Sequence, residues 1–198
     1  MKKIMFNDRY GLTEAVLNGR KTMTRRILKG DYETIKAYHA NGGWFFIADT
    51  GEGDSVGFRV GEVVAIAQSY KSAGYEPGRN IPVKEHGGLQ VRADSLKGWR
   101  NKMFVKADLM PHLIRITNIK VERLQDISDE DCRKEGIMEG EFTNTWDTFY
   151  YDHWGDVPNH ITFRTPRQAF ASLIDKISGK GTWQKNPWVF AYEFELVQ

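Results

Sequence analysis

Cysteine is almost absent from this sequence of 198 residues, because Cys132 is the only one. A single thiol excludes an intramolecular disulfide framework and any zinc site built from several cysteines. Long apolar runs are also missing: no stretch approaches the roughly 18 residues that a membrane-spanning helix needs. The first nine residues are too polar for a signal peptide. We therefore expect a soluble, cytoplasmic protein that has no membrane partner.

Several catalytic signatures are missing too. The sequence has no G-x-x-x-x-G-K-[ST], H-E-x-x-H, C-x-x-C or G-x-S-x-G motif, which are the usual marks of P-loop NTPases, zincins, dithiol or zinc-cysteine sites and nucleophile-elbow hydrolases. The five histidines are scattered, and one polar stretch combines two of them with two aspartates in a spacing that matches no metal-binding pattern: Asp152, His153, Asp156 and His160. We interpret that stretch as a loop and expect neither a metal nor another cofactor.

The composition is that of a folded chain, with 40% hydrophobic, 13% aromatic and 27% charged residues. The net charge is only +2, but the charges are unevenly distributed. Residues 1–30 hold eight Lys or Arg against two acidic residues, and residues 120–160 hold four against eleven. Such a division can make one face attractive to phosphates, or the two segments can simply face each other or solvent.

Local patterns predict several short strands and three helices. The helices are expected over residues 10–18, 129–135 and 166–178, each followed by a glycine that ends it. The last of them has an apolar face that we expect to be buried: Ala169, Phe170, Leu173, Ile174 and Ile177. The segments with strand-like composition are 4–6, 21–28, 44–47, 63–67, 102–106, 113–124 and 188–195.

Two segments lack a regular period. Residues 71–100 are rich in glycine and proline, and residues 140–165 are aromatic and polar. We interpret both as loop-rich insertions in a single domain that covers residues 1–198. Because the strands do not alternate regularly with helices, the pattern favours a small mixed β-barrel or an α+β fold, rich in strands and with short helices at its ends.

The densest cluster of polar residues is Gly19–Arg26, which contains four cations and two threonines directly after a predicted helix. One interpretation is structural: a glycine cap is followed by an edge strand that charge protects from pairing. The other is chemical, because cations can hold phosphate and a threonine hydroxyl can act as a nucleophile when a lysine of lowered pKa serves as its base. Lys21 and Thr24 would face opposite ways in a regular strand, so cooperation requires a turn or a lysine stem that wraps around the chain.

Three segments of the sequence resemble those of a known family: Ala15–Arg26, Val121–Ile137 and Asn186–Phe194. In this order they are similar to the N-terminal signature, the strand-then-helix segment and the closing strand of the ASCH domain family, which is related to the PUA domains. The similarity is greatest to the longer ASCH proteins of bacteriophages and prophages. The resemblance implies a PUA-like β-barrel whose cleft suits a nucleoside or a nucleic acid, and it implies RNA or DNA as a partner.

The resemblance also implies a reaction. A small enzyme of this family is an amidohydrolase that removes the acetyl group from acetylated cytidine with a lysine, a threonine and a glutamate, and its motif places these residue types at Lys21, Thr24 and Glu135. Thr24 would attack the amide carbonyl, Lys21 would accept its proton, and Glu135 would orient Lys21 or share the proton transfer. If Glu135 is the base instead, Lys21 would stabilise the oxyanion.

The alternative is a module that binds RNA or modified DNA through the same cleft without chemistry. In either case we expect three arginines and one tryptophan to contact the ligand: Arg20, Arg25, Arg26 and Trp183. Trp183 lies in a basic segment that we predict to be a flexible loop, so core packing remains an equal alternative for this side chain.

Overall fold

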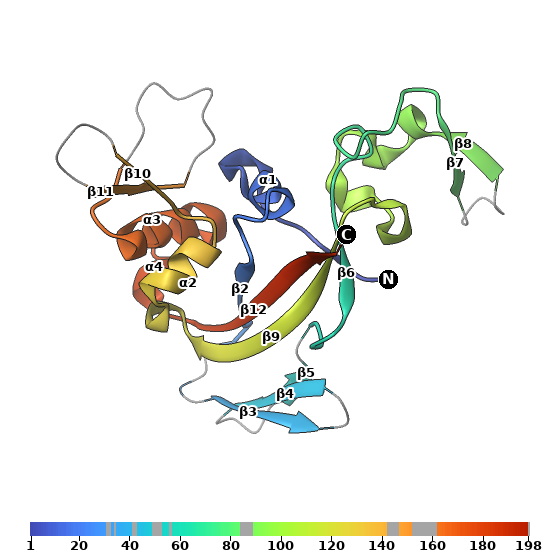
Figure 1. Cartoon of the computed structure of the whole chain (residues 1–198). Coiled ribbons are helices and arrows are strands. Elements are labelled where there is room, and N and C mark those ends of the chain that lie inside the picture. The colour runs from blue at the N-terminus through green and yellow to red at the C-terminus, as the bar shows by residue number, and fades with distance from the viewer. Residues whose placement is uncertain are drawn as a thin grey trace. The chain divides into compact units, whose positions relative to one another are not determined.

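A computed structural model describes residues 1–30, 33, 35–40, 43–48, 53–55, 57–83, 89–141, 147–151 and 162–197 (Figure 1). The strands are β1 (Lys3–Ile4), β2 (Met23–Ile27), β3 (Ile35–Ala40), β4 (Gly43–Ala48), β5 (Gly53–Ser55), β6 (Val63–Ile66), β7 (Asn80–Val83), β8 (Leu89–Arg92), β9 (Leu113–Arg123), β10 (Met138–Glu141), β11 (Asp147–Tyr150) and β12 (Trp188–Val197). The α-helices are α1 (Leu12–Leu17), α2 (Asp129–Lys134), α3 (Pro166–Ser178) and α4 (Thr182–Lys185). Turns of 3-10 helix cover Asp8–Tyr10, Ala93–Ser95, Lys97–Trp99, Lys102–Phe104, Ala107–Leu109 and Leu124–Asp126.

The main sheet has five strands in the order β1-β6-β9-β12-β2. It is mixed, because β1 pairs with β6 in parallel whereas β12 pairs with β2 in antiparallel orientation. The other strands of the described residues form small antiparallel sheets, β3-β4-β5, β7-β8 and β10-β11. The observed class is therefore α+β with a mixed sheet and short helices, as the sequence predicts at this coarse level.

Helices α2 and α3 begin directly after the capping residues that the sequence provides. The Ser128 hydroxyl accepts a hydrogen bond from the Asp131 N–H and begins α2, which ends before Gly136 at a φ of +102°. Thr165 caps α3 in the same way through the Gln168 N–H, and Pro166 occupies the first turn. These local signals confirm the predicted positions of both helices to within about two residues, the usual uncertainty of a helix boundary.

Three sequence predictions differ from the structure. The expected strand over residues 102–106 is a 3-10 turn, because the Asn101 side chain accepts from the Met103 N–H and only Val105 is buried. Ile177 does not join the buried face of α3, since it lies in the last turn of the helix and is 37% exposed. The supposedly irregular segment 71–100 contains the hairpin β7-β8 and two 3-10 turns.

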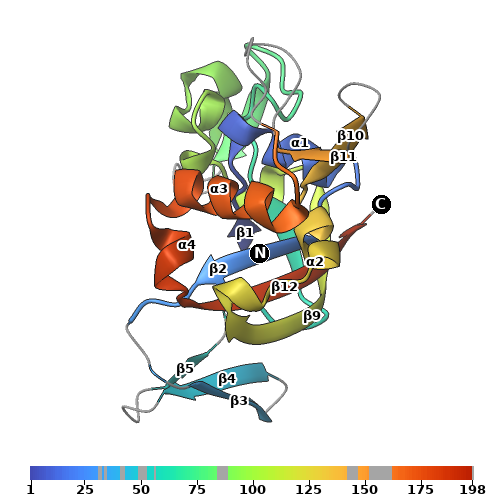
Figure 2. The ribbon, with the colours of Figure 1, turned by 90° about the vertical axis from the view of Figure 1, so that its left-hand side faces the viewer.

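The chain is divided into two compact units. The smaller unit combines Met1–Phe6, Val63–Ile114 and Leu196–Gln198, and the larger unit combines Asn7–Glu62 and Arg115–Glu195. A core of seven buried side chains holds the smaller unit together: Ala65, Ala67, Tyr70, Ile81, Ala93, Val105 and Met110. In the larger unit, α2 and α3 cover one face of the strands β2, β12 and β9 (Figure 2).

Candidate functional site

The segment between α1 and β2 is fixed by backbone hydrogen bonds. Gly19 has a φ of +72° and donates to the Val16 carbonyl, which ends α1. The Lys21 N–H then donates to the Ala15 carbonyl, and the Thr22 N–H donates to the Lys134 carbonyl, each at 2.9 Å. Lys21 therefore enters the interior beside α1 and beside the C-terminal end of α2.

The Lys21 side chain is buried and bound to Glu135. Its Nζ atom donates to Glu135 Oε2 at 2.5 Å and to the Glu135 backbone carbonyl at 2.7 Å. Lys21 is 2% exposed and Glu135 is 4% exposed. The two residues are 114 positions apart in the sequence. Because the carbonyl belongs to the end of α2, the ammonium group also meets the negative end of that helix, a favourable place for a cation.

Burial lowers the pKa of Lys21. Glu135 opposes this shift, whereas the charges of Arg26 and Arg25 add to it, and the net direction is downward from the ordinary value of 10.5. The lysine is thus moved toward the neutral amine, the form in which it can accept a proton.

Arg25 links Glu135 to two further carboxylates. Its Nη1 atom lies 3.2 Å from Glu135 Oε1, its Nη2 atom lies 2.9 Å from Asp131 Oδ2, and its Nε and Nη2 atoms donate to Glu122 Oε1 at 2.9 and 2.6 Å. The side chain is 1% exposed. Burial opposes the charge of this guanidinium, but Glu135 and Glu122 outweigh it and raise the pKa of Arg25. All three guanidinium nitrogens of Arg25 therefore donate hydrogen bonds to carboxylates inside the protein.

We call these five side chains the Lys21 cluster: Lys21, Arg25, Glu122, Asp131 and Glu135. Two cations face three carboxylates, and Lys120 and Lys134 each approach Asp131 to 3.9 Å from the solvent side. The charges are therefore nearly balanced, as buried ionic groups require. The sequence predicted Lys21, Arg25 and Glu135 as site residues but not Glu122 and Asp131, which lie 97 and 106 positions from Arg25 on β9 and α2.

Thr24 lies on the opposite face of β2 from Arg25. In the β2-β12 ladder Thr24 stands across from Tyr192 and Arg25 stands across from Ala191, and successive side chains of a strand alternate between its two faces. Thr24 is 6% exposed, and the described hydrogen bonds of the Lys21 ammonium and the Glu135 carboxylate join these two groups to each other, to the Glu135 carbonyl and to Arg25. The structure thus brings Lys21 and Glu135 together without a hydrogen bond from Thr24 to either.

Tyr192 lies beside Thr24 on the same face of the β2-β12 ladder. Its hydroxyl accepts hydrogen bonds from the backbone of Gly57 and Phe58, and burial raises the pKa of Tyr192 to about 12. The Phe58 ring packs edge-on against it, with ring centroids 5.2 Å apart. Arg26 lies on this same face by the alternation of the strand, opposite Phe190, and is exposed. Sequence analysis did not single out Tyr192 as a neighbour of Thr24, because the ladder register sets that pairing.

Trp183 belongs to helix α4, not to a flexible loop. Its backbone N–H donates to Asp175 Oδ1 at 2.7 Å, and its carbonyl accepts from Gln125 Nε2 at 2.8 Å. Its ring is half-buried and packs edge-on against Phe170, and the Arg25 guanidinium carbon lies 6.0 Å from the centroid of the Phe170 ring. The indole is therefore separated from the Lys21 cluster by one phenylalanine. Arg20 is exposed in the turn before Lys21.

Metal-ligand geometry does not occur among the residues that the structure describes: no group of three or more His, Cys, Asp or Glu side chains there is arranged to hold an ion. The predicted polar loop with Asp152, His153, Asp156 and His160 lies outside the described residues. Cys132 is fully buried in α2, and burial raises the pKa of its thiol to about 12, so it remains a protonated packing group.

Comparisons of the chain with models of protein families, with curated proteins and with solved structures find no match. Within the described residues, no helix has the length and apolar character that crossing a bilayer requires.

Proposed function

We propose that this chain is an ASCH-type protein with a PUA-like barrel, and that it recognises a nucleoside or nucleic acid at the segment Gly19–Arg26. The observation that supports the proposal is the buried contact of 2.5 Å between Lys21 Nζ and Glu135 Oε2. The family resemblance implies a functional role for both residues. A buried lysine of lowered pKa beside a carboxylate is also the kind of pair that acid–base chemistry uses.

The sharpest form of the proposal is hydrolysis of an N-acylated cytosine nucleoside. The Thr24 oxygen forms a bond to the acyl carbon while its proton passes to Lys21, which must first give up its own proton to react as the amine. The tetrahedral intermediate then breaks its bond to the cytosine N4 atom, which leaves as an amine after taking that proton. Water attacks the acyl-threonine ester, releases the carboxylic acid and restores Thr24. This route requires the Thr24 hydroxyl to approach Lys21 when the substrate binds.

Non-catalytic binding of RNA or modified DNA is the second candidate, and the placement of Thr24 favours it. Both oxygens of Glu135 already accept from buried cations, and Thr24 faces away from Arg25. In this form the Lys21 cluster holds the shape of β2, while the exposed Arg20 and Arg26 contact phosphate.

A hydrolysis assay separates the two forms. Purified protein is incubated with a panel of N-acylated cytosine nucleosides, and release of cytidine is measured for the wild type, Lys21→Ala and Lys21→Met, with the exposed Lys29→Ala as the matched control. The hydrolytic form predicts turnover by the wild type and the control and a loss of at least 100-fold in kcat in both Lys21 variants, since positioned proton transfer contributes about 10²–10⁴.

Thr24→Val against Thr22→Val provides a second matched pair, because both threonines lie on the same side of the extended chain. Loss of turnover in Thr24→Val alone identifies the nucleophile. Absence of turnover by folded wild-type protein, together with measurable nucleoside or oligonucleotide binding that Arg26→Gln weakens, establishes the binding form. If the folded protein shows no turnover and no binding, the proposed function is contradicted.

A further inference from the structure

The smaller unit has a net positive charge and the larger unit a net negative charge. This unit contains ten Lys or Arg against four Asp or Glu, a formal net charge of +6, whereas the larger unit contains 18 against 22, a net charge of −4. The small net charge of the whole chain hides this division. Since phosphates are attracted by local positive charge, the net charge of the smaller unit favours a binding site for a polyanion there.

One loop of this unit is anchored on a buried tyrosine. Tyr70 is 1% exposed; its N–H donates to the Gly98 carbonyl at 2.9 Å, and its hydroxyl accepts from the Lys106 N–H at 3.1 Å. A Cβ atom at Gly98 would lie 2.5 Å from the Tyr70 ring, so only glycine permits this approach. Residues 97–106 are thus held in a defined conformation against the core of the unit.

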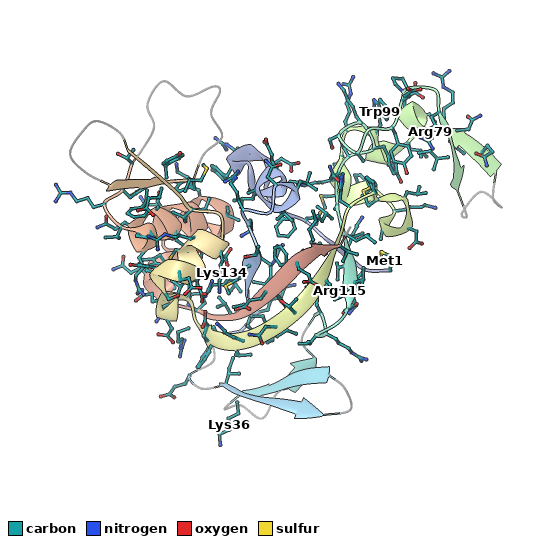
Figure 3. The ribbon with its side chains drawn as sticks, in the orientation of Figure 1. Met1, Lys36, Arg79, Trp99, Arg115 and Lys134 are labelled. Atoms are coloured by element: carbon teal, nitrogen blue, oxygen red, sulfur yellow. The ribbon has the colours of Figure 1, made fainter. Side chains whose placement is uncertain are left out.

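The anchored loop presents cations and an aromatic ring to solvent. Lys97 and Arg100 are exposed, and Phe104 is 54% exposed with the Lys97 ammonium 5.8 Å from its ring centroid. The Lys71 N–H donates to the Trp99 carbonyl at 3.2 Å, which brings a further exposed lysine beside the loop. We call this surface the Lys97 patch: Lys71, Lys97, Trp99, Arg100 and Phe104. Figure 3 labels Trp99 among the side chains of this unit.

Within the part of the chain that the structure describes, the cations of the patch have no acidic partners. Among the described residues of the smaller unit, ion pairs join Arg92 to Asp94 and the N-terminal ammonium to Asp108, but Lys71, Lys97 and Arg100 form none. Their charge therefore remains available to a ligand. Phe104 and the 62% exposed Met103 next to it also leave apolar surface in water that a stacked base would cover.

We propose that the Lys97 patch binds single-stranded nucleic acid. Lys71, Lys97 and Arg100 contact successive phosphates, and Phe104 stacks on a base. A single strand is favoured over a duplex because its bases are open to stacking. It is favoured over an anionic membrane because the patch is built from three-residue 3-10 turns, whereas membrane-surface binding relies on an amphipathic helix. The inference uses no residue of the Lys21 cluster and goes beyond the proposed function.

The test is binding of a fluorescein-labelled 20-nucleotide oligouridylate to the full chain, followed by fluorescence anisotropy from 50 to 300 mM NaCl. The triple variant Lys71→Gln/Lys97→Gln/Arg100→Gln is expected to weaken binding at least tenfold at 50 mM salt. It is also expected to flatten the slope of log affinity against log salt by about 2, because each phosphate contact on a single strand contributes about 0.7. Phe104→Ala is expected to weaken binding about tenfold with the slope unchanged, as loss of one base–aromatic stack does.

The matched control removes three exposed lysines of the larger unit, Lys29→Gln/Lys36→Gln/Lys180→Gln, and thus changes the net charge equally. It is expected to leave the affinity within twofold. The inference is overturned if the wild type does not bind the oligonucleotide, if the control weakens binding as much as the patch variant, or if Phe104→Ala has no effect. It is also overturned if vesicles containing phosphatidylserine bind the chain and the oligonucleotide does not.

Lys21→Met separates this inference from the proposed function. Oligouridylate binding that persists in Lys21→Met and is lost in the patch variant supports the Lys97 patch, whatever the hydrolysis assay shows. Binding that is lost in Lys21→Met and kept in the patch variant would overturn the Lys97 patch and favour the Gly19–Arg26 segment.

Discussion

Glu135 is the side chain on which the Lys21 cluster depends. Its two carboxylate oxygens are bound by different cations, Lys21 at 2.5 Å and Arg25 at 3.2 Å. Loss of Glu135 would leave both cations buried with less compensation, whereas loss of Lys21 would leave Glu135 paired with Arg25. Removal of the lysine would also abolish the cost of burying its amine. The two partners of the same ion pair are therefore unequal.

We predict that Glu135→Leu lowers the free energy of unfolding by about 3–5 kcal/mol, the range for breaking a buried ion pair from one side. Lys21→Met should cost clearly less. Urea unfolding followed by tryptophan fluorescence measures both, with Glu130→Leu as the control because Glu130 is an exposed glutamate of the same helix. An equal loss of stability in Lys21→Met and Glu135→Leu would show that Glu135 is not the centre of the cluster.

At the residue scale, the sequence predicted some members of the Lys21 cluster but not which side chains would be in contact. The resemblance pointed to Lys21 and Glu135, which are in contact. The partners of Arg25 are separated from it by 97 and 106 positions, so they depend on how α2 and β9 pack against β2. No local pattern carries that information. Thr24 illustrates the reverse: strand alternation alone predicted that its side chain and that of Lys21 would face opposite ways in a regular strand.

At the scale of elements, α2 is what carries Glu135 to Lys21. This helix has only six residues, too few to be stable alone, so its capping residue and its packing decide whether it forms. The Ser128 hydroxyl satisfies the Asp131 N–H, and Gly136 ends the helix in a left-handed conformation. Both signals were readable in the sequence, which is why this helix was predicted within a residue of its observed bounds.

Ser128→Ala is expected to lower the free energy of unfolding by about 1 kcal/mol, the usual cost of a lost N-cap. The same urea experiment measures it, and Ser178→Ala is the matched control because Ser178 is an exposed serine at the opposite, C-terminal end of a helix. A change no larger than that of the control would mean that tertiary packing alone holds α2.

Two elements differ from what the local composition predicts, the turn at residues 102–106 and the hairpin β7-β8. Residues 102–106 have strand-like composition, yet Asn101 caps a turn there and leaves Met103 and Phe104 in solvent. The hairpin β7-β8 arises in a segment whose glycines and prolines indicated a loop. In both cases interactions specific to the folded chain outweighed a weak compositional signal.

At the scale of the whole molecule, the smaller unit gathers residues from three separated parts of the chain, residues 1–6, 63–114 and 196–198. From the sequence we predict a single domain over residues 1–198 with insertions at 71–100 and 140–165, and local periodicity does not report which distant segments share a core. The charge division between the units was also missed, since counting charge along the chain emphasised residues 1–30. Two of those cations, Lys21 and Arg25, are buried in the larger unit.

The most direct test of the central claim, that the Gly19–Arg26 segment and the end of α2 recognise a nucleoside, is a titration by NMR. Backbone amide shifts of the ¹⁵N-labelled full chain are recorded while N4-acetylcytidine or cytidine is added. We predict shifts concentrated at Lys21–Arg26 and at Lys134–Gly136, larger for the acylated nucleoside. Shifts that leave both segments unchanged at saturating nucleoside, or that are confined to another part of the chain, would contradict the account.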